Sequence, residues 1–214
     1  MLPDAGAAAR RLASLIAERA RQSVAERGTF AIALSGGRAP WQAFRLLWEE
    51  DVPWDRVGIY QVDERVAPRG DDARNLTHLE QSLPQAALPR LRAMPVEAED
   101  LDAAALGYAE ELPETFDLVH LGLGPDGHTA SLVPGDPVLE VTDRDVALTG
   151  EYQGRRRMTL TYPPLDRARE LVWLVVGVDK TEALRRLLEG DPGIPAGRIR
   201  NRGSLVLTDV VDPG

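Results

Sequence analysis

The chain has 214 residues, of which 43% are hydrophobic and 28% charged, a balance typical of a globular protein that buries a core. Its formal net charge of −9 argues against a general nucleic-acid binder, because phosphate backbones need a basic face. It contains no cysteine, which excludes disulfides, thiolate nucleophiles and cysteine-based metal sites. Because it shows no membrane-length apolar run and no signal-peptide pattern, we expect no membrane partner and a cytoplasmic location.

The first glycine-rich motif follows a predicted strand. Residues 6–26 have the apolar spacing of a helix, and residues 29–34 read as a buried strand. The motif SGGRAP at 35–40 then leads into a helix predicted over 41–49. Such a turn can bind phosphate through backbone N–H groups; the alternative is a tight connection in which glycine supplies a positive φ. The motif lacks the lysine and spacing of a nucleotide P-loop, so we expect no nucleotide cofactor.

Charged residues follow the second predicted strand. Residues 56–62 read as a second buried strand, which ends at Asp63, Glu64 and Arg65. In a parallel sheet, strands end at the edge where ligands bind, although a solvated loop is the alternative. Because this is the second polar loop predicted at that edge, we favour a functional role for it. A helix is predicted to begin soon afterwards, at Asn75.

The most informative stretch runs from residue 117 to residue 135. Residues 118–123 read as a buried parallel strand, which breaks at Gly124-Pro125-Asp126-Gly127. The pattern then predicts the first turn of a short helix, containing His128 and two hydroxyl side chains. An aspartate and a histidine at the carboxyl edge of a sheet predict a site there.

Three cationic or titratable positions in the second half are also informative. His120 lies inside a predicted strand, and we interpret it as a core histidine. The arginines at 155–157 are most simply a solvated loop, but one of them could reach an anionic ligand. Lys180 occupies a strand-to-helix corner, where its ammonium group could face a bound phosphate; the alternative is an exposed lysine.

The alternation of elements predicts an α/β fold with a doubly wound, mostly parallel sheet and some added antiparallel strands. We expect one domain over residues 1–214, present as a monomer or a weak homo-oligomer. Helices are predicted over 6–26, 41–49, 75–83, 100–112 and 181–189, and a short helix or a turn over 163–169. Strands are predicted over 29–34, 56–62, 92–96, 118–123, 145–148, 157–161, 171–176 and 204–208, and Pro95 makes the strand at 92–96 a candidate for the edge of the sheet.

Six motifs occur in order along nearly the whole chain: SGGRAP at 35–40, VDERVAP at 62–68, Asn75-Leu76, GLGPDGHTASLVPG at 122–135, RMTLTYPPLDRA at 157–168 and GVDK at 177–180. Together they resemble the 6-phosphogluconolactonase family. The resemblance implies hydrolysis of 6-phosphoglucono-δ-lactone to 6-phosphogluconate in the oxidative pentose phosphate pathway, without a metal or organic cofactor. It also implies a Rossmann-like fold shared with glucosamine-6-phosphate deaminases. Arg74 departs from the pattern, since the family usually has a small serine there, and we expect it to alter a contact at the mouth of the site.

The chemistry of lactone hydrolysis assigns candidate roles. His128 is the natural general base, because imidazole titrates near neutral pH, and Asp126 is expected either to orient it or to cap the helix. Asp63 is the third candidate catalytic residue, either binding sugar hydroxyls or assisting the base. Backbone N–H groups and Arg65 are candidates for stabilising the oxyanion. The candidate substrate- and phosphate-binding residues are Ser35, Gly36, Gly37, Arg38, Arg65, Asn75, Gly124, Gly127, Arg157 and Lys180.

Two alternative functions remain. The first is a glucosamine-6-phosphate deaminase-like isomerase. By resemblance, such enzymes carry a glutamate five residues after the equivalent of His128, where this chain has Val133. The second is a sugar-phosphate-binding protein without catalysis, against which the presence of both His128 and Asp126 weighs.

Overall fold

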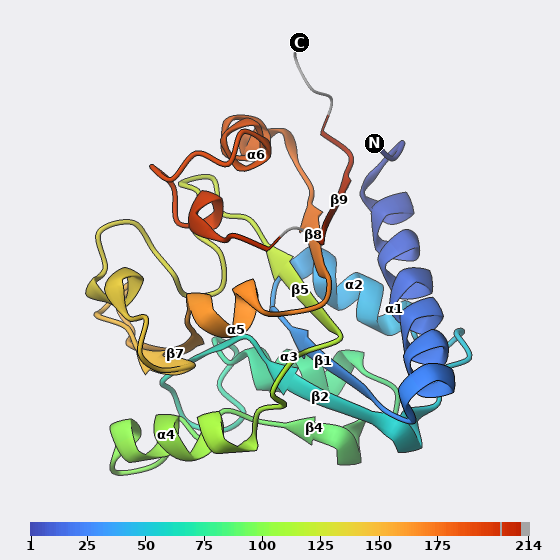
Figure 1. Ribbon diagram of the computed structural model, residues 1–214, viewed down its shortest axis with the longest axis horizontal. Helices are drawn as coiled ribbons and strands as arrows, with labels where there is room; N and C mark the ends of the chain where they lie inside the picture. The colour runs from blue at the N-terminus through green and yellow to red at the C-terminus, as the bar shows by residue number, and fades with distance from the viewer. Residues whose placement is uncertain (202, 211–214) are drawn as a thin grey trace.

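The computed structural model describes residues 1–201 and 203–210, and its centre is a sheet of six parallel strands (Figure 1). The strands are β1 (Phe30–Leu34), β2 (Val57–Gln61), β4 (Leu91–Arg92), β5 (Leu118–Gly122), β8 (Leu171–Val175) and β9 (Ser204–Thr208). Their order is β4-β2-β1-β5-β8-β9. The chain therefore builds the sheet outward from β1 in one direction, then returns past β1 and builds it in the other. This confirms the predicted doubly wound sheet, and the winding reverses between β1 and β5.

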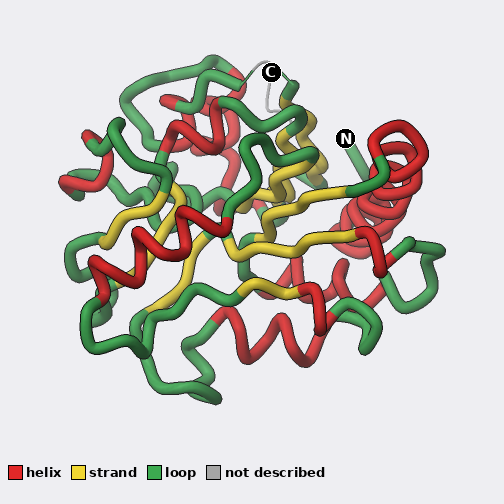
Figure 2. The backbone as a smooth tube through the Cα atoms, turned by 60° about the horizontal axis from the view of Figure 1, so that its bottom comes forward, coloured by secondary structure: helices red, strands yellow, loops and turns green. Residues whose placement is uncertain are grey.

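Helices cover both faces of this sheet (Figures 1 and 2). One face packs against α1 (Ala5–Arg27), α2 (Arg38–Leu46) and α3 (Asn75–Ser82). The other packs against α4 (Leu101–Glu111), α5 (Tyr162–Asp166) and α6 (Thr181–Leu188). Successive side chains of β1 divide between the two layers, because side chains alternate across a strand: Ile32 and Leu34 enter the first core and Ala33 the second. Burial on both faces explains why these strands read as continuous apolar runs.

The boundaries of α1 follow from two residues beside it. The side chain of Asp4 accepts a hydrogen bond from the backbone N–H of Ala7 at 2.7 Å and so caps the first turn. Gly28 ends the helix with a φ of 81°, and its N–H donates to the carbonyl of Val24. Between them, Leu12 and Ile16 belong to the buried stripe that packs on the sheet.

A second sheet of three antiparallel strands lies beyond the carboxyl end of β2. Its order is β3-β7-β6, formed by β3 (Asp63–Arg65), β6 (Val146–Leu148) and β7 (Arg157–Leu160). Val62 alone separates β2 from β3, and it bonds to both sheets. Its N–H donates to the carbonyl of Leu34 at 3.1 Å, and its carbonyl accepts from the N–H of Leu160 at 2.8 Å. The predicted antiparallel additions are confirmed, as a separate sheet joined directly to the first.

One local prediction is wrong. No short helix follows Gly127: Thr129 pairs with Leu132 in an isolated β-bridge, and Ala130 has a φ of 52°, outside the right-handed helical region. The short strand predicted near residue 92 is β4, which lies at the edge of the sheet as expected but ends at Arg92. None of the helices in residues 1–201 and 203–210 has the length and apolar character needed to cross a bilayer.

Candidate active site

A cleft of about 170 Å³ opens at the carboxyl ends of β1 and β5, where the winding of the sheet reverses. It gathers residues that are far apart in the sequence, from the loops after β1 and β5, from β3 and β7, from the start of α3 and from the short 3₁₀ turn Val178–Lys180. The predicted site residues that line it are Ser35, Gly36, Asp63, Arg65, Asn75, Gly124, His128, Arg157 and Lys180.

His128 and Asp126 form a hydrogen-bonded pair at this cleft. Nδ1 of His128 lies 2.5 Å from Oδ1 of Asp126, which also accepts from the backbone N–H of His128 at 3.2 Å. Gly124 leaves the space for this pair, because a Cβ at that position would lie 2.0 Å from the same Nδ1. Since the aspartate occupies Nδ1, Nε2 is the ring nitrogen left for proton transfer.

The surroundings of Asp126 favour its ionised form. Burial alone would raise the pKa of Asp126, but hydrogen bonds from the side chain and backbone of His128 outweigh burial and lower it. The hydroxyl of Tyr152 donates to the other carboxylate oxygen at 3.3 Å, and its ring stands edge-on to His128 with the centroids 5.8 Å apart. An ionised Asp126 accepts the Nδ1–H bond, which fixes the tautomer of the imidazole.

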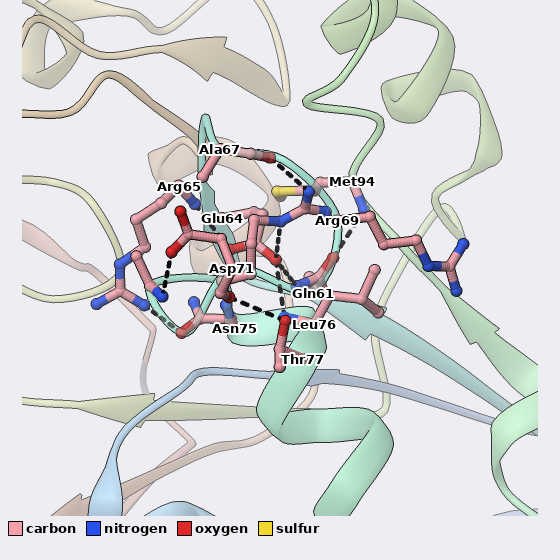
Figure 3. A network of polar contacts seen from close by, with 12 residues as sticks. Gln61, Glu64, Arg65, Ala67, Arg69, Asp71, Asn75, Leu76, Thr77 and Met94 are labelled. Carbon is pink, nitrogen blue, oxygen red and sulfur yellow. Dashed lines mark hydrogen bonds and ion pairs between the residues drawn. The ribbon is translucent and has the colours of Figure 1, made fainter.

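Asn75 connects two charged residues of the cleft. Its Oδ1 accepts from the guanidinium of Arg65 (Figure 3), and its Nδ2 donates to the backbone carbonyl of Asp63 at 2.9 Å. Asp63 is buried and accepts from the hydroxyl of Ser131 at 2.6 Å. Gly36 gives this group room, because a Cβ there would lie 1.9 Å from Oδ1 of Asn75. Protein donors thus engage both carboxylate oxygens of Asp63, which suits binding and orientation better than proton transfer.

Positive charge and donors that lack a partner in the described part of the chain also line the cleft. Arg157 is 4% exposed, and its pKa is lowered first by burial and then by the charge of Arg65. Its Nε, like the buried Oγ of Ser35, finds no hydrogen-bond partner among the described residues. Lys180 adds a third cation. Such a set of donors suits an anion with several acceptor oxygens, such as a phosphate.

Four predicted residues fall outside the lining of the cleft: Asp126, which contacts it through His128, and Gly37, Arg38 and Gly127. Gly37, with a φ of 137°, is the residue before α2, and Arg38 is the exposed first residue of that helix. Gly127 has a φ of 80°, and a Cβ there would lie 2.5 Å from Cβ of Ile194. Backbone conformation and close packing therefore explain why Gly127 is a glycine.

A hairpin at the cleft was missed from the sequence. Tyr152 and Arg155 pair as a bridge around Gln153 and Gly154, both with positive φ, between β6 and β7. Gln153 accepts from Nη2 of Arg157 at 3.2 Å, and the guanidinium of Arg157 lies 4.9 Å from the ring centroid of Tyr152. Gly154, just before a predicted strand, was the signal of a tight hairpin turn.

The expectation that Arg74 alters the mouth of the site is wrong. Arg74 is 1% exposed, and its Nε lies 3.1 Å from a carboxylate oxygen of the fully buried Glu64. Its Nη1 also donates to the carbonyl of Ala67 at 2.8 Å. The long side chain reaches buried acceptors instead of solvent, and no local pattern in the sequence indicates this partner.

Larger hollows lie elsewhere, among them two with volumes of about 620 and 780 Å³. Charged side chains that line them pair with one another, as Arg19 does with Glu170 at 2.5 Å and Arg198 with Glu140 at 2.9 Å. Size alone therefore does not mark the functional cleft. In residues 1–201 and 203–210, no group of three or more histidine, aspartate or glutamate side chains is arranged to bind a metal ion.

Known proteins share both the sequence pattern and the fold. The family model described as glucosamine-6-phosphate isomerases/6-phosphogluconolactonase matches residues 3–207. The chain belongs to this family. A relative from Synechocystis sp., named 6-phosphogluconolactonase, is 36% identical over 210 residues, covering 89% of this chain and 86% of its own. The protein of that name from Mycobacterium tuberculosis is also 36% identical over 210 residues, covering 87% and 85%.

Solved structures of proteins named 6-phosphogluconolactonase and glucosamine-6-phosphate deaminase superimpose closely on this chain. A 6-phosphogluconolactonase from Shewanella baltica gives a TM-score of 0.87 at 28% identity, covering 97% of this chain and 94% of that one. A monomeric glucosamine-6-phosphate deaminase gives a TM-score of 0.81 at 20% identity, covering 97% of this chain and 95% of that one. This likeness shows the fold alone. Because the fold is shared by proteins of both names, the residues of the cleft must distinguish the two activities.

Proposed function

We propose that this protein hydrolyses 6-phosphoglucono-δ-lactone to 6-phosphogluconate in the oxidative pentose phosphate pathway. The observation that supports it best is that His128, bonded to Asp126 at 2.5 Å, shares one small cleft with Arg65, Arg157 and Lys180. The cleft thus combines a general base with donors for a phosphate. Relatives named 6-phosphogluconolactonase, 36% identical over most of the chain, support the same activity.

His128 acts as the general base in this proposal. Nε2 takes a proton from water while the water oxygen bonds to the lactone carbonyl carbon. The bond from that carbon to the ring oxygen then breaks, its electron pair stays on the ring oxygen, and the imidazolium returns the proton there. Asp126 accepts the Nδ1–H bond throughout and stabilises the imidazolium. Base catalysis of this kind contributes about 10²–10⁴-fold.

The other cleft residues bind and orient the substrate. Arg157 and Lys180, with Ser35 and the backbone of Gly36, are assigned to the phosphate, because they line the cleft and because Nε of Arg157 and Oγ of Ser35 have no hydrogen-bond partner among the described residues. Arg65, held by Asn75, is assigned to the developing oxyanion, and Asp63 to sugar hydroxyls. Gly37, Arg38 and Gly127 are assigned no direct contact, since they do not line the cleft.

Val133 favours lactone hydrolysis over deamination. The side chain at this position is 4% exposed and belongs to the buried hydrophobic residues. A deaminase-like reaction on this fold would use a carboxylic acid at that position for ring opening. Valine has no proton to transfer, so this position cannot supply the acid for amino-sugar isomerisation, which favours hydrolysis.

A direct assay decides between these activities. Freshly generated 6-phosphogluconolactone and glucosamine 6-phosphate are each incubated with the protein, and spontaneous lactone hydrolysis is subtracted. We expect enzyme-dependent loss of the lactone and no ammonia from the amino sugar. Binding of 6-phosphogluconate without turnover of either compound would support the non-catalytic alternative instead.

We also propose that the protein works in the cytoplasm as a monomer or weak homo-oligomer. The large hydrophobic side chains exposed on the described residues are spread over separate elements, such as Leu106 on α4, Leu188 on α6 and Leu205 on β9. Isolated residues of this kind do not form a strong interface. Sedimentation at micromolar concentration tests the oligomeric state, and fractionation of the source cells tests the location.

A further inference from the structure

Glu64 is a buried carboxylate with no place in the reaction described above. It is 0% exposed, although it directly precedes Arg65 of the cleft. Its Oε1 accepts from the backbone N–H groups of Arg65 and Asn75, each at 2.8 Å. Its Oε2 accepts from the backbone N–H of Leu76 at 2.8 Å and from Nε2 of Gln61 at 2.9 Å (Figure 3).

These bonds join the end of β3 to the beginning of α3. Asn75 and Leu76 are the first two residues of α3, whose N–H groups have no acceptor within the helix. The N-cap residue itself makes no side-chain capping bond, so Glu64 caps the helix from a neighbouring strand. A carboxylate also matches the positive end of the helix dipole.

Arg74 supplies the positive charge that this carboxylate needs. A buried carboxylate without a counter-charge is strongly destabilising. The guanidinium of Arg74 is itself buried, with Nε 3.1 Å from Oε2 of Glu64, and a bond to the carbonyl of Ala67 fixes it in place. Glu97, which is more exposed, lies 3.6 Å from the same guanidinium.

We propose that Glu64 is a positioning residue of the active cleft, which acts with Arg74 by locking β3 to α3. Arg65 and Asn75 both donate their backbone N–H to Oε1 of Glu64, and their side chains bond to each other in the cleft. One carboxylate oxygen thus fixes the spacing between the two backbones that the side-chain contact requires. The kinetic part of this proposal rests on the proposed lactonase function.

A double-mutant cycle tests whether Glu64 acts through Asn75. We expect Glu64→Gln to lower kcat/KM for the lactone by about tenfold or more, because one amide group cannot accept all four bonds. In an Asn75→Ala background, the same substitution should cost only about twofold, since the contact it supports is already lost. A full tenfold loss in both backgrounds would show a general structural effect and overturn the proposal.

Further variants separate positioning from loss of folding. Arg74→Lys, which keeps the charge, should retain more kcat/KM than Arg74→Met, with both compared at a temperature where circular dichroism shows them folded. Glu170→Gln is the matched control: it breaks an ion pair with Arg19 that lies away from the cleft and should leave kcat/KM unchanged. Equal activity of Arg74→Lys and Arg74→Met would contradict the role given to the counter-charge.

A binding measurement keeps the test independent of turnover. The dissociation constant of 6-phosphogluconate, measured by calorimetry, should rise in Glu64→Gln and not in Glu170→Gln. If the wild-type protein binds this compound but does not hydrolyse the lactone, the proposed function fails while the positioning role is still tested. Equal affinity in folded wild-type and Glu64→Gln proteins would overturn the positioning role.

Discussion

Arg65 and Arg157 stand directly opposite each other in the antiparallel ladder between β3 and β7, and both line the cleft. Like charges at such positions repel each other. The charge of Arg65 accordingly adds to burial in lowering the pKa of Arg157. The ligand-free protein therefore holds two cations together at a cost that a bound anion would remove.

A phosphorylated ligand should therefore stabilise the fold. At a concentration of 100 times its dissociation constant, 6-phosphogluconate should add about 2.7 kcal/mol to the free energy of unfolding and raise Tm. Arg157→Gln should lose most of this shift, because the buried donor of the anion is removed. Differential scanning calorimetry measures the Tm shift of the wild-type protein and of Arg157→Gln. Gluconate, which lacks the phosphate, is the control ligand, and an equal shift with gluconate would contradict a phosphate site here.

Replacing His128 should remove the base and leave the fold intact. We expect His128→Ala to lower lactonase turnover by at least about tenfold, within the range of general base catalysis. His78→Ala is a suitable control, because the ring of His78 stacks on that of Trp41 with the centroids 4.0 Å apart and does not line the cleft. Unchanged turnover of His128→Ala on fresh lactone would remove His128 from the mechanism.

Lys180 should contribute to binding more than to chemistry. We expect Lys180→Ala to raise KM with little change in kcat, because the ammonium group is assigned to a phosphate that does not react. The position also permits a chemical test, since Lys180 is the only lysine in the sequence. An amine-directed reagent should modify Lys180, and 6-phosphogluconate should protect it. A fall in kcat alone, or labelling that ignores the ligand, would contradict this role.

Gly124 should be intolerant of any side chain. A Cβ there would lie 2.0 Å from Nδ1 of His128, so Gly124→Ala should displace the imidazole from Asp126 and reduce kcat. Gly107→Ala is the matched control, because nothing lies within 4 Å of a Cβ at that position in α4. Steady-state kinetics and a crystal structure of Gly124→Ala would show whether the loss of activity follows the displacement of His128.

His120 should make the folded protein sensitive to acid. Burial lowers its pKa from 6.5 to about 3, so the unfolded chain binds a proton over this range that the folded chain does not. Stability should therefore fall as the pH is lowered below 6.5, by about 1.4 kcal/mol per pH unit from this residue. Urea unfolding at several pH values measures the slope. His120→Gln should reduce the slope of stability against pH, and an unchanged slope would show that other groups determine the pH dependence.

Much of the architecture could be predicted from the sequence, because strands that are buried on both faces have nearly continuous apolar sequences. The run at 171–176 predicted β8, and the alternation of helices and strands predicted the doubly wound order. The wrong predictions fall where backbone conformation depends on distant partners. Ala130 adopts a positive φ that alanine does not favour by itself, so no local pattern could reveal the turn that replaces the expected helix.

The gathering of the cleft residues followed from topology, but their contacts did not. Strand ends predicted that His128, Asp63 and Ser35 would share one edge. The bond between Arg65 and Asn75 depends instead on the buried carboxylate of Glu64, which accepts hydrogen bonds from the backbone of both residues. Arg74 was misjudged for the same reason, since an isolated arginine in a sequence is normally a surface residue.

The joint at Val62 makes this stretch of chain intolerant of changes in length. Since β2 ends at Gln61 and β3 begins at Asp63, a single inserted residue would turn Asp63 and Arg65 to the opposite side of their strand. Loops elsewhere on the surface can grow or shrink without that effect. A library of insertions and deletions along the gene should therefore contain almost no active variant with a changed length at Val62, while substitutions among small apolar residues there survive.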